Sequence, residues 1–115
     1  FDGYYEAGLV SNQTINAGLP FGGNAALLAA YSPLKLVSTV DKSMRSRLFF
    51  VIAGDPAEPL YGPQMTQLLA RLDALGYPHA TIADPIGHSW IEVRRLLPAA
   101  LEAVAARLVA QGVFQ

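Results

Sequence analysis

Apolar residues follow a different pattern in each part of the second half of the chain. From Leu48 to Ala53 they form an unbroken run, which is typical of a strand buried on both faces of a parallel sheet. From Pro63 to Gly76 they recur at helical spacing, between residues that favour a helix start and a helix end. His79 to Ala83 is predicted to be a second strand. A longer helical pattern covers Ile91 to Leu108, and Pro98 is expected to kink or restart that helix.

The first 47 residues are less regular, and we expect a strand end, a lid-like loop and a short helix there. Phe1 to Tyr5 is rich in aromatic residues and suits a short strand. Residues 8–24 have the Gly, Asn and Pro content of a loop. Asn24 can cap a short helix over Ala25 to Tyr31. Leu34 to Val40 is predicted to be extended.

These patterns predict an α/β fold in a single partial domain, residues 1–115, in which residues 48–115 contribute strand, helix, strand and helix. Each connection between strands is long enough for a crossover helix, so the strands should be parallel. A sheet of so few strands is not stable alone. We therefore expect the missing strands to come from an upstream segment, a companion chain or a second copy, and a homodimer is one way to cover the apolar surface.

Composition narrows the classes of function. Hydrophobic residues make up 52% and charged residues 15% of the 115 positions, and the net charge is −1. That charge argues against a nucleic-acid partner. The chain has no cysteine, and its two histidines do not form a metal-ligand pattern, so we expect neither metal nor cofactor. No segment suggests a signal peptide or a membrane span. The start at Phe1 suggests a longer precursor, the preference for Arg over Lys favours a bacterial source, and the compartment is undecided.

The candidate chemistry lies in the loops after the two strands. Gly87-His88-Ser89-Trp90 follows the second strand and precedes a helix, whereas Asp55 and Glu58 follow the first strand. Acid followed by histidine is the order in which α/β-hydrolases place the last two members of a Ser-acid-His triad. The chain has no Gly-x-Ser-x-Gly, and its serines lack the strand-to-helix turn that exposes a nucleophile.

From Leu48 to Leu101 the chain resembles the C-terminal part of the esterase D and enterochelin-esterase group of α/β-hydrolases, which is also similar to the mycolyltransferases. The matching pieces are the apolar strand into Gly54, Glu58-Pro59-Leu60, the helix ending at Gly76, the strand from His79, and Gly87-His88-Ser89-Trp90 before an Arg-bearing helix. Phe1-Asp2-Gly3-Tyr4-Tyr5 is similar to the strand end that follows the nucleophile helix in these enzymes.

The resemblance implies the C-terminal half of a serine esterase, with the nucleophile upstream of Phe1. His88 matches the family's triad base. Glu58 aligns best with the acid, and Asp55 is the alternative, with a plain turn role as its other interpretation. Trp90 would line a pocket for a small-molecule or lipid ester, or else pack against the next helix. An acyltransferase would use the same residues, and a non-catalytic interaction or dimerisation module is a further alternative.

Overall fold

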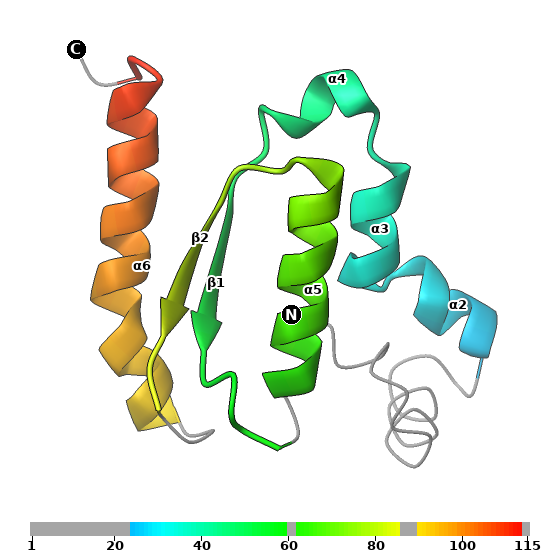
Figure 1. The fold of residues 1–115 in the computed structure, drawn as a ribbon, viewed down its shortest axis with the longest axis horizontal. Coiled ribbons are helices and arrows are strands. Elements are labelled where there is room, and N and C mark those ends of the chain that lie inside the picture. Colours follow the sequence, from blue (N-terminus) through cyan, green and yellow to red (C-terminus); the bar gives the residue numbers. More distant parts are fainter. Residues whose placement is uncertain (1–23, 60–61, 86–89, 114–115) are drawn as a thin grey trace.

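The computed structural model describes residues 24–59, 62–85 and 90–113. Their elements are α2 (Ala25–Ala30), α3 (Pro33–Thr39), α4 (Lys42–Arg45), β1 (Phe50–Gly54), α5 (Gly62–Leu75), β2 (His79–Ala83) and α6 (Trp90–Ala110). The sheet lies between α6 on one side and α5 with α3 on the other (Figure 1). The chain is therefore of the α/β class, and the predicted order of strand, helix, strand and helix is confirmed from β1 to α6. Residues 1–23, which include the predicted strand end and nearly all of the predicted loop, lie outside the described residues.

The two strands are parallel neighbours, as the sequence predicts. Their register runs from Phe50 opposite His79 to Gly54 opposite Ala83. The helix between them, α5, packs on β1 on the side opposite α6 (Figure 1). The two strands consequently end at the same edge of the sheet.

One edge of β1 has no neighbouring strand among the described residues. The amide of Phe50 and the carbonyl of Gly54 both form hydrogen bonds toward β2, each at 3.2 Å. Since successive residues of a strand direct their backbone groups to opposite edges, Val51 and Ala53 direct theirs away from β2. Ala53 is exposed, although it belongs to the most apolar run of the chain.

Helix α5 begins and ends at the residues that the sequence indicates. Pro63 stands in its first turn, where a missing amide donor has no cost. At the other end Gly76 has φ +72°, and its amide donates to Asp73 while the amide of Tyr77 donates to Leu72, both at 3.0 Å. This is a Schellman motif, which requires a left-handed residue and therefore favours glycine.

The hydrophobic core lies between α3, α5 and one face of the sheet. Val37, Leu68, Leu72 and Tyr77 are all less than 10% exposed, and the partly buried residues packed against them are Leu34, Val40, Phe50, Ile52 and Leu75. The hydroxyl of Tyr77 donates to the carbonyl of Val37 at 2.7 Å. The ring of Tyr77 also meets that of Phe50 edge to face, at 5.3 Å. Tyr77 thus joins α3 to the start of β2.

The prediction of an extended segment over Leu34 to Val40 is wrong, because α3 occupies residues 33–39. Pro33 ends α2 but also suits the first turn of the next helix. Leu34 and Val37 are three residues apart and pack into the same core beside α5, which an extended strand would not allow. Tertiary packing therefore decides the conformation of this short segment.

The short helix α4, which the sequence patterns did not reveal, is fixed by its two ends. Asp41 caps it, because its Oδ1 accepts from the hydroxyl of Ser43 at 2.6 Å and from the amide of Ser43 at 2.8 Å. These two hydrogen bonds hold the pKa of Asp41 below its ordinary value of 3.8. Arg45 donates to the carbonyl of Leu75 at 3.3 Å and to that of Val40 at 3.1 Å. It thereby joins α4 to the C-terminal end of α5.

Helix α6 runs without interruption through Pro98, so the restart that the sequence suggests does not occur. Pro98 has no amide to donate to the carbonyl of Arg94, but both residues are exposed and water can satisfy that carbonyl. Leu96 is only 6% exposed, and Ala100 and Ala103 are half-buried. These residues form the face of α6 that packs on the strands.

Candidate functional site

The carboxyl ends of β1 and β2 lie side by side, and each strand continues directly into an aspartate. Asp55 follows Gly54 and Asp84 follows Ala83, and these two strand ends are partners in the parallel register. The amide of Asp84 donates to the carbonyl of Gly54 at 3.2 Å. Open α/β sheets place ligands and reactive groups at such carboxyl ends. The loops that leave the two strands are therefore the candidate site.

Asp55 stabilises its own turn. Its Oδ1 accepts from the amide of Ala57 at 2.8 Å, and its carbonyl accepts from the amide of Glu58 at 3.2 Å. An aspartate that bonds the amide two residues on forms an Asx turn. One oxygen of Asp55 is thus used within the loop, which agrees with the turn role considered for this residue.

Glu58 lies at the other end of the same turn and is half-buried. Its carbonyl accepts from the amide of Gly62 at 2.9 Å, so the turn is bonded to the first residue of α5. A Cβ at position 62 would lie only 2.3 Å from the carbonyl oxygen of Pro56. Because Gly62 has no side chain, the loop can lie against α5. The backbone of Glu58 is thereby held in place by the start of this helix.

His88, the predicted general base, lies outside the described residues, as do the residues on either side of it. The structure nevertheless describes where this segment begins and ends, because β2 stops at Ala83 and α6 starts at Trp90. Since β2 is the neighbour of β1, the segment leaves the sheet at the same edge as the loop that carries Asp55 and Glu58. The pairing of His88 with either acid stays a prediction.

An ion pair that sequence reasoning missed joins the two ends of the segment that contains His88. Arg95 Nη2 lies 3.5 Å from Asp84 Oδ2, with the two side chains 61% and 36% exposed. A pair this exposed stabilises a fold by at most about 1 kcal/mol. Its position links the end of β2 to the second turn of α6. The available signal was an acid directly after a strand and a basic residue early in the following helix.

Trp90, predicted to line a substrate pocket, is the first residue of α6 and is 82% exposed. A hollow of about 130 Å³ lies instead between β1 and α6, lined by Ala53, Leu96, Leu97 and Ala100. It adjoins the end of β1, and its four lining residues are all of apolar type. A second, open hollow of about 350 Å³, lined by Leu34, Gln67, Ala70, Arg71 and Ala74, lies away from the strand ends.

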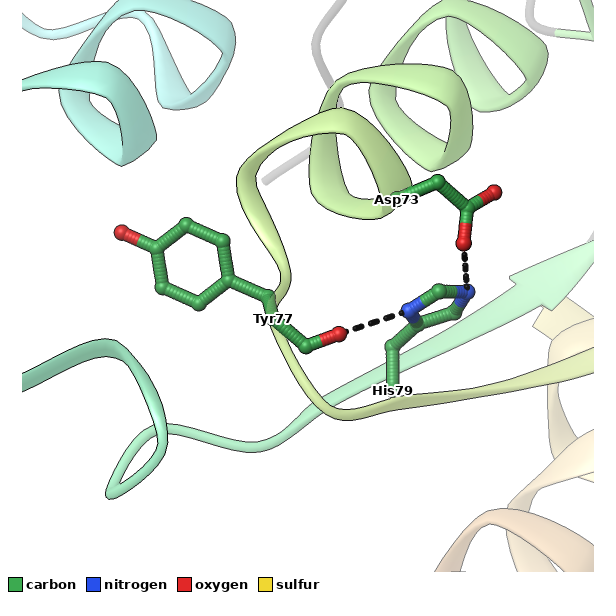
Figure 2. Close-up of polar contacts among 3 residues, drawn as sticks. All are labelled: Asp73, Tyr77 and His79. Carbon is green, nitrogen blue, oxygen red and sulfur yellow. Dashed lines mark hydrogen bonds and ion pairs between the residues drawn. The ribbon is translucent and has the colours of Figure 1, made fainter. Parts of the chain in front are cut away.

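His79 lies at the opposite end of the sheet from the candidate site. Its Nδ1 is 3.0 Å from the carbonyl oxygen of Tyr77, and its Nε2 is 3.6 Å from Asp73 Oδ1 (Figure 2). A carbonyl can only accept, so Nδ1 carries the proton in this contact. The imidazole side chain is only 18% exposed, so His79 is largely enclosed at the start of β2. The contacts tie the start of β2 to the end of α5.

Within residues 24–59, 62–85 and 90–113, no group of histidine and acidic side chains is arranged to hold a metal ion. No helix in that part of the chain has both the length and the apolar character needed to cross a bilayer. Comparisons of the chain with protein-family models, with curated proteins and with solved structures found no match.

Proposed function

We propose that this chain forms the C-terminal part of a serine carboxylic-ester hydrolase and supplies the acid and the histidine of its catalytic triad. The parallel pairing of β1 with β2 is the observation that supports the proposal. It puts the ends of β1 and β2 at one edge of the sheet, and in the sequence these ends continue into the acidic loop and then into the segment with His88. The resemblance of residues 48–101 to the C-terminal part of the esterase D group supports the same assignment. An upstream segment or a companion chain of the same precursor supplies the serine.

In this proposal the serine attacks the carbonyl carbon of a small-molecule or lipid ester. His88 accepts the serine proton and then passes it to the leaving alcohol, and in the second half of the cycle it activates the water that releases the acid. Backbone amides of the completing segment stabilise the oxyanion. The apolar hollow beside Ala53 adjoins the strand ends and suits part of an acyl group.

Glu58 is the acid in this proposal, and Asp55 is a turn residue. Asp55 already accepts the amide of Ala57 through one carboxylate oxygen, which fixes it within its own loop. Glu58 has a longer side chain than Asp55, and its backbone carbonyl is hydrogen-bonded to the first residue of α5. A carboxylate in the triad accepts the ring N–H of the histidine and stabilises the imidazolium that forms.

The test is labelling with a fluorophosphonate probe, applied to the polypeptide or complex that joins this chain to the segment with the serine. Intact mass under denaturing conditions identifies the labelled chain. The proposal expects one adduct on a serine upstream of Phe1. Absence of any adduct on folded material would overturn it.

Three variants of the completed protein test the roles of the residues. His88→Ala and Glu58→Gln should each lower kcat by roughly a thousandfold to ten-thousandfold, with far-UV circular dichroism unchanged. Asp55→Asn is the matched control, because it removes a carboxylate from the same loop and should leave kcat within about fivefold. A larger loss with Asp55→Asn than with Glu58→Gln would reverse the assignment of the acid.

Two alternatives use the same fold. An acyltransferase would pass the acyl group to an alcohol, so added acceptor alcohols would form esters faster than water forms the free acid. A non-catalytic interaction module is favoured by the edge of β1 at Val51 and Ala53, which has no neighbouring strand among the described residues, because such an edge can accept an added strand. That module would bind no fluorophosphonate.

A further inference from the structure

Along one flank of α6 runs a row of large apolar residues that are exposed or half-buried. Trp90 is 82%, Leu97 52%, Leu101 59% and Val104 39% exposed, and the half-buried Leu108 extends the row. In Figure 1 the helix stands at one side of the molecule, and none of the described elements lies beyond it. We call these five residues the α6 seam.

The α6 seam has the spacing of a helix that packs against another helix. Its members are separated by seven, four, three and four residues, with Arg94 in the remaining position, which is the alternation of a heptad pattern. The core needs a different set of residues, because Leu96, Ala100 and Ala103 face the strands. Leu97 also borders the hollow beside Ala53, but 52% of it stays exposed. Among the described residues, the seam therefore keeps an exposed apolar surface that the packing on the strands does not use.

We infer that the α6 seam binds the α6 seam of a second copy of this chain, with the two helices antiparallel. In the register that aligns the seams, Trp90 lies opposite Leu108 of the second copy, and Leu97 lies opposite Leu101. This contact is isologous, since each pair occurs twice about a two-fold axis. The inference does not rest on the proposed esterase function.

Charge favours the antiparallel arrangement. A parallel pair would place Arg94 beside Arg94 of the second copy, and two like charges within an apolar seam repel and lose hydration. The antiparallel register places Arg94 opposite Val104 instead. In this register Glu102 of the second copy is only two residues from the position opposite Arg94, and it lies on the same side of the seam, so the two opposite charges are close.

The area of the seam is adequate for a weak dimer. From the exposed fractions, its side chains would bury on the order of 500 Å² on each copy. That corresponds to a total near the lower bound of about 1,000 Å² for specific interfaces. The expected association is therefore concentration-dependent, with a Kd in roughly the micromolar range.

Sedimentation velocity of the full chain over a concentration series is the first test. We expect the mass to change from one copy to two across roughly the micromolar range, and Leu101→Glu to weaken association at least tenfold. Leu36→Glu is the matched control, because Leu36 is an exposed leucine, at 44%, on α3. Circular dichroism must show that both variants are folded. A folded chain that stays monomeric, or a dimer that Leu101→Glu does not weaken, would overturn the inference.

Disulfide trapping tests the register, because the chain has no cysteine of its own. The double variant L97C/L101C should form a covalent dimer on mild oxidation. An internal bond is disfavoured, since residues four apart on a helix have Cβ atoms about 5–6 Å apart and a disulfide needs about 3.8 Å. The single variant L97C should cross-link poorly, because antiparallel packing offsets position 97 of one copy from position 97 of the other by about 6 Å along the helix. Efficient cross-linking of L97C would indicate parallel packing and refute the inference.

Discussion

Replacement of Gly62 by alanine tests whether the loop of Asp55 and Glu58 is held against α5. A Cβ at this position would lie 2.3 Å from the carbonyl oxygen of Pro56, whereas ordinary contact begins at 3.4 Å. The oxygen would have to retreat by about 1 Å. Because the obstacle is backbone, it cannot turn away as a flexible side chain can.

The free energy needed to displace the loop opposes the free energy gained because alanine favours a helix more than glycine does. Displacing the loop disturbs the hydrogen bond from the amide of Gly62 to Glu58, at 2.9 Å, and forced overpacking costs about 1–3 kcal/mol. Alanine favours a helix over glycine by at most about 1 kcal/mol, and less at a first position. We expect Gly62→Ala to lower the free energy of unfolding by about 1–2 kcal/mol, which corresponds to a fall in Tm of roughly 4–8 °C.

The assay is urea unfolding followed by far-UV circular dichroism. Gly76→Ala is the control for the backbone alone, because nothing lies within 4 Å of its added Cβ but its φ is +72°, so strain of about 1 kcal/mol is its only cost. In a completed enzyme Gly62→Ala should also reduce kcat, whereas Gly76→Ala should not. A Gly62→Ala chain as stable as the parent would refute the close approach of the loop to α5.

Two further predictions concern the packing of the short helices. Tyr77→Phe should destabilise the fold by about 1–2 kcal/mol, because the carbonyl of Val37 would lose its 2.7 Å hydrogen bond in the core. The control is Tyr31→Phe, at a residue that is 58% exposed, which should change the urea midpoint little. Equal effects of the two variants would contradict a stabilising role for the hydroxyl of Tyr77. The carboxylate of Asp41 should titrate below 3.8 in an NMR pH series, since the bonds from Ser43 lower its pKa. Its contribution to the stability of α4 is then complete above pH 3.8 and lost as the pH falls through the lowered pKa. Asp41→Asn should abolish this pH dependence of stability. In the parent chain, a titration midpoint of the Asp41 carboxylate at or above 3.8 would contradict the prediction.

The strands and α5 were predictable because their signals are local. The apolar run before Gly54 indicates a strand in a parallel sheet, and Pro63 and Gly76 mark the ends of α5. Helix α3 was not predictable in this way, since Leu34 and Val37 become a core face only when α5 is beside them. A seven-residue segment has too little intrinsic preference to resist its neighbours.

Of the candidate site, the structure describes the strand ends and the loop of Asp55 and Glu58, whereas the role of His88 stays a prediction. Sequence order placed the acids and His88 after successive strands, and the register of β1 and β2 brings the ends of these two strands to one edge. The ion pair between Asp84 and Arg95 had a signal in the residue types and their positions, but that signal alone does not fix the pairing, because the contact also depends on how α6 returns across the sheet. A turn role for Asp55 was one interpretation of the sequence, and the structure describes an Asx turn there.

The exposure of Trp90 has a spectroscopic consequence. It is the single tryptophan of the chain, and 82% of its surface already contacts solvent. Its emission should therefore be that of a hydrated indole in the folded monomer, and unfolding should shift the emission maximum little. Any blue shift in this protein accordingly signals that something has covered the start of α6, so intrinsic fluorescence reports on association rather than on folding.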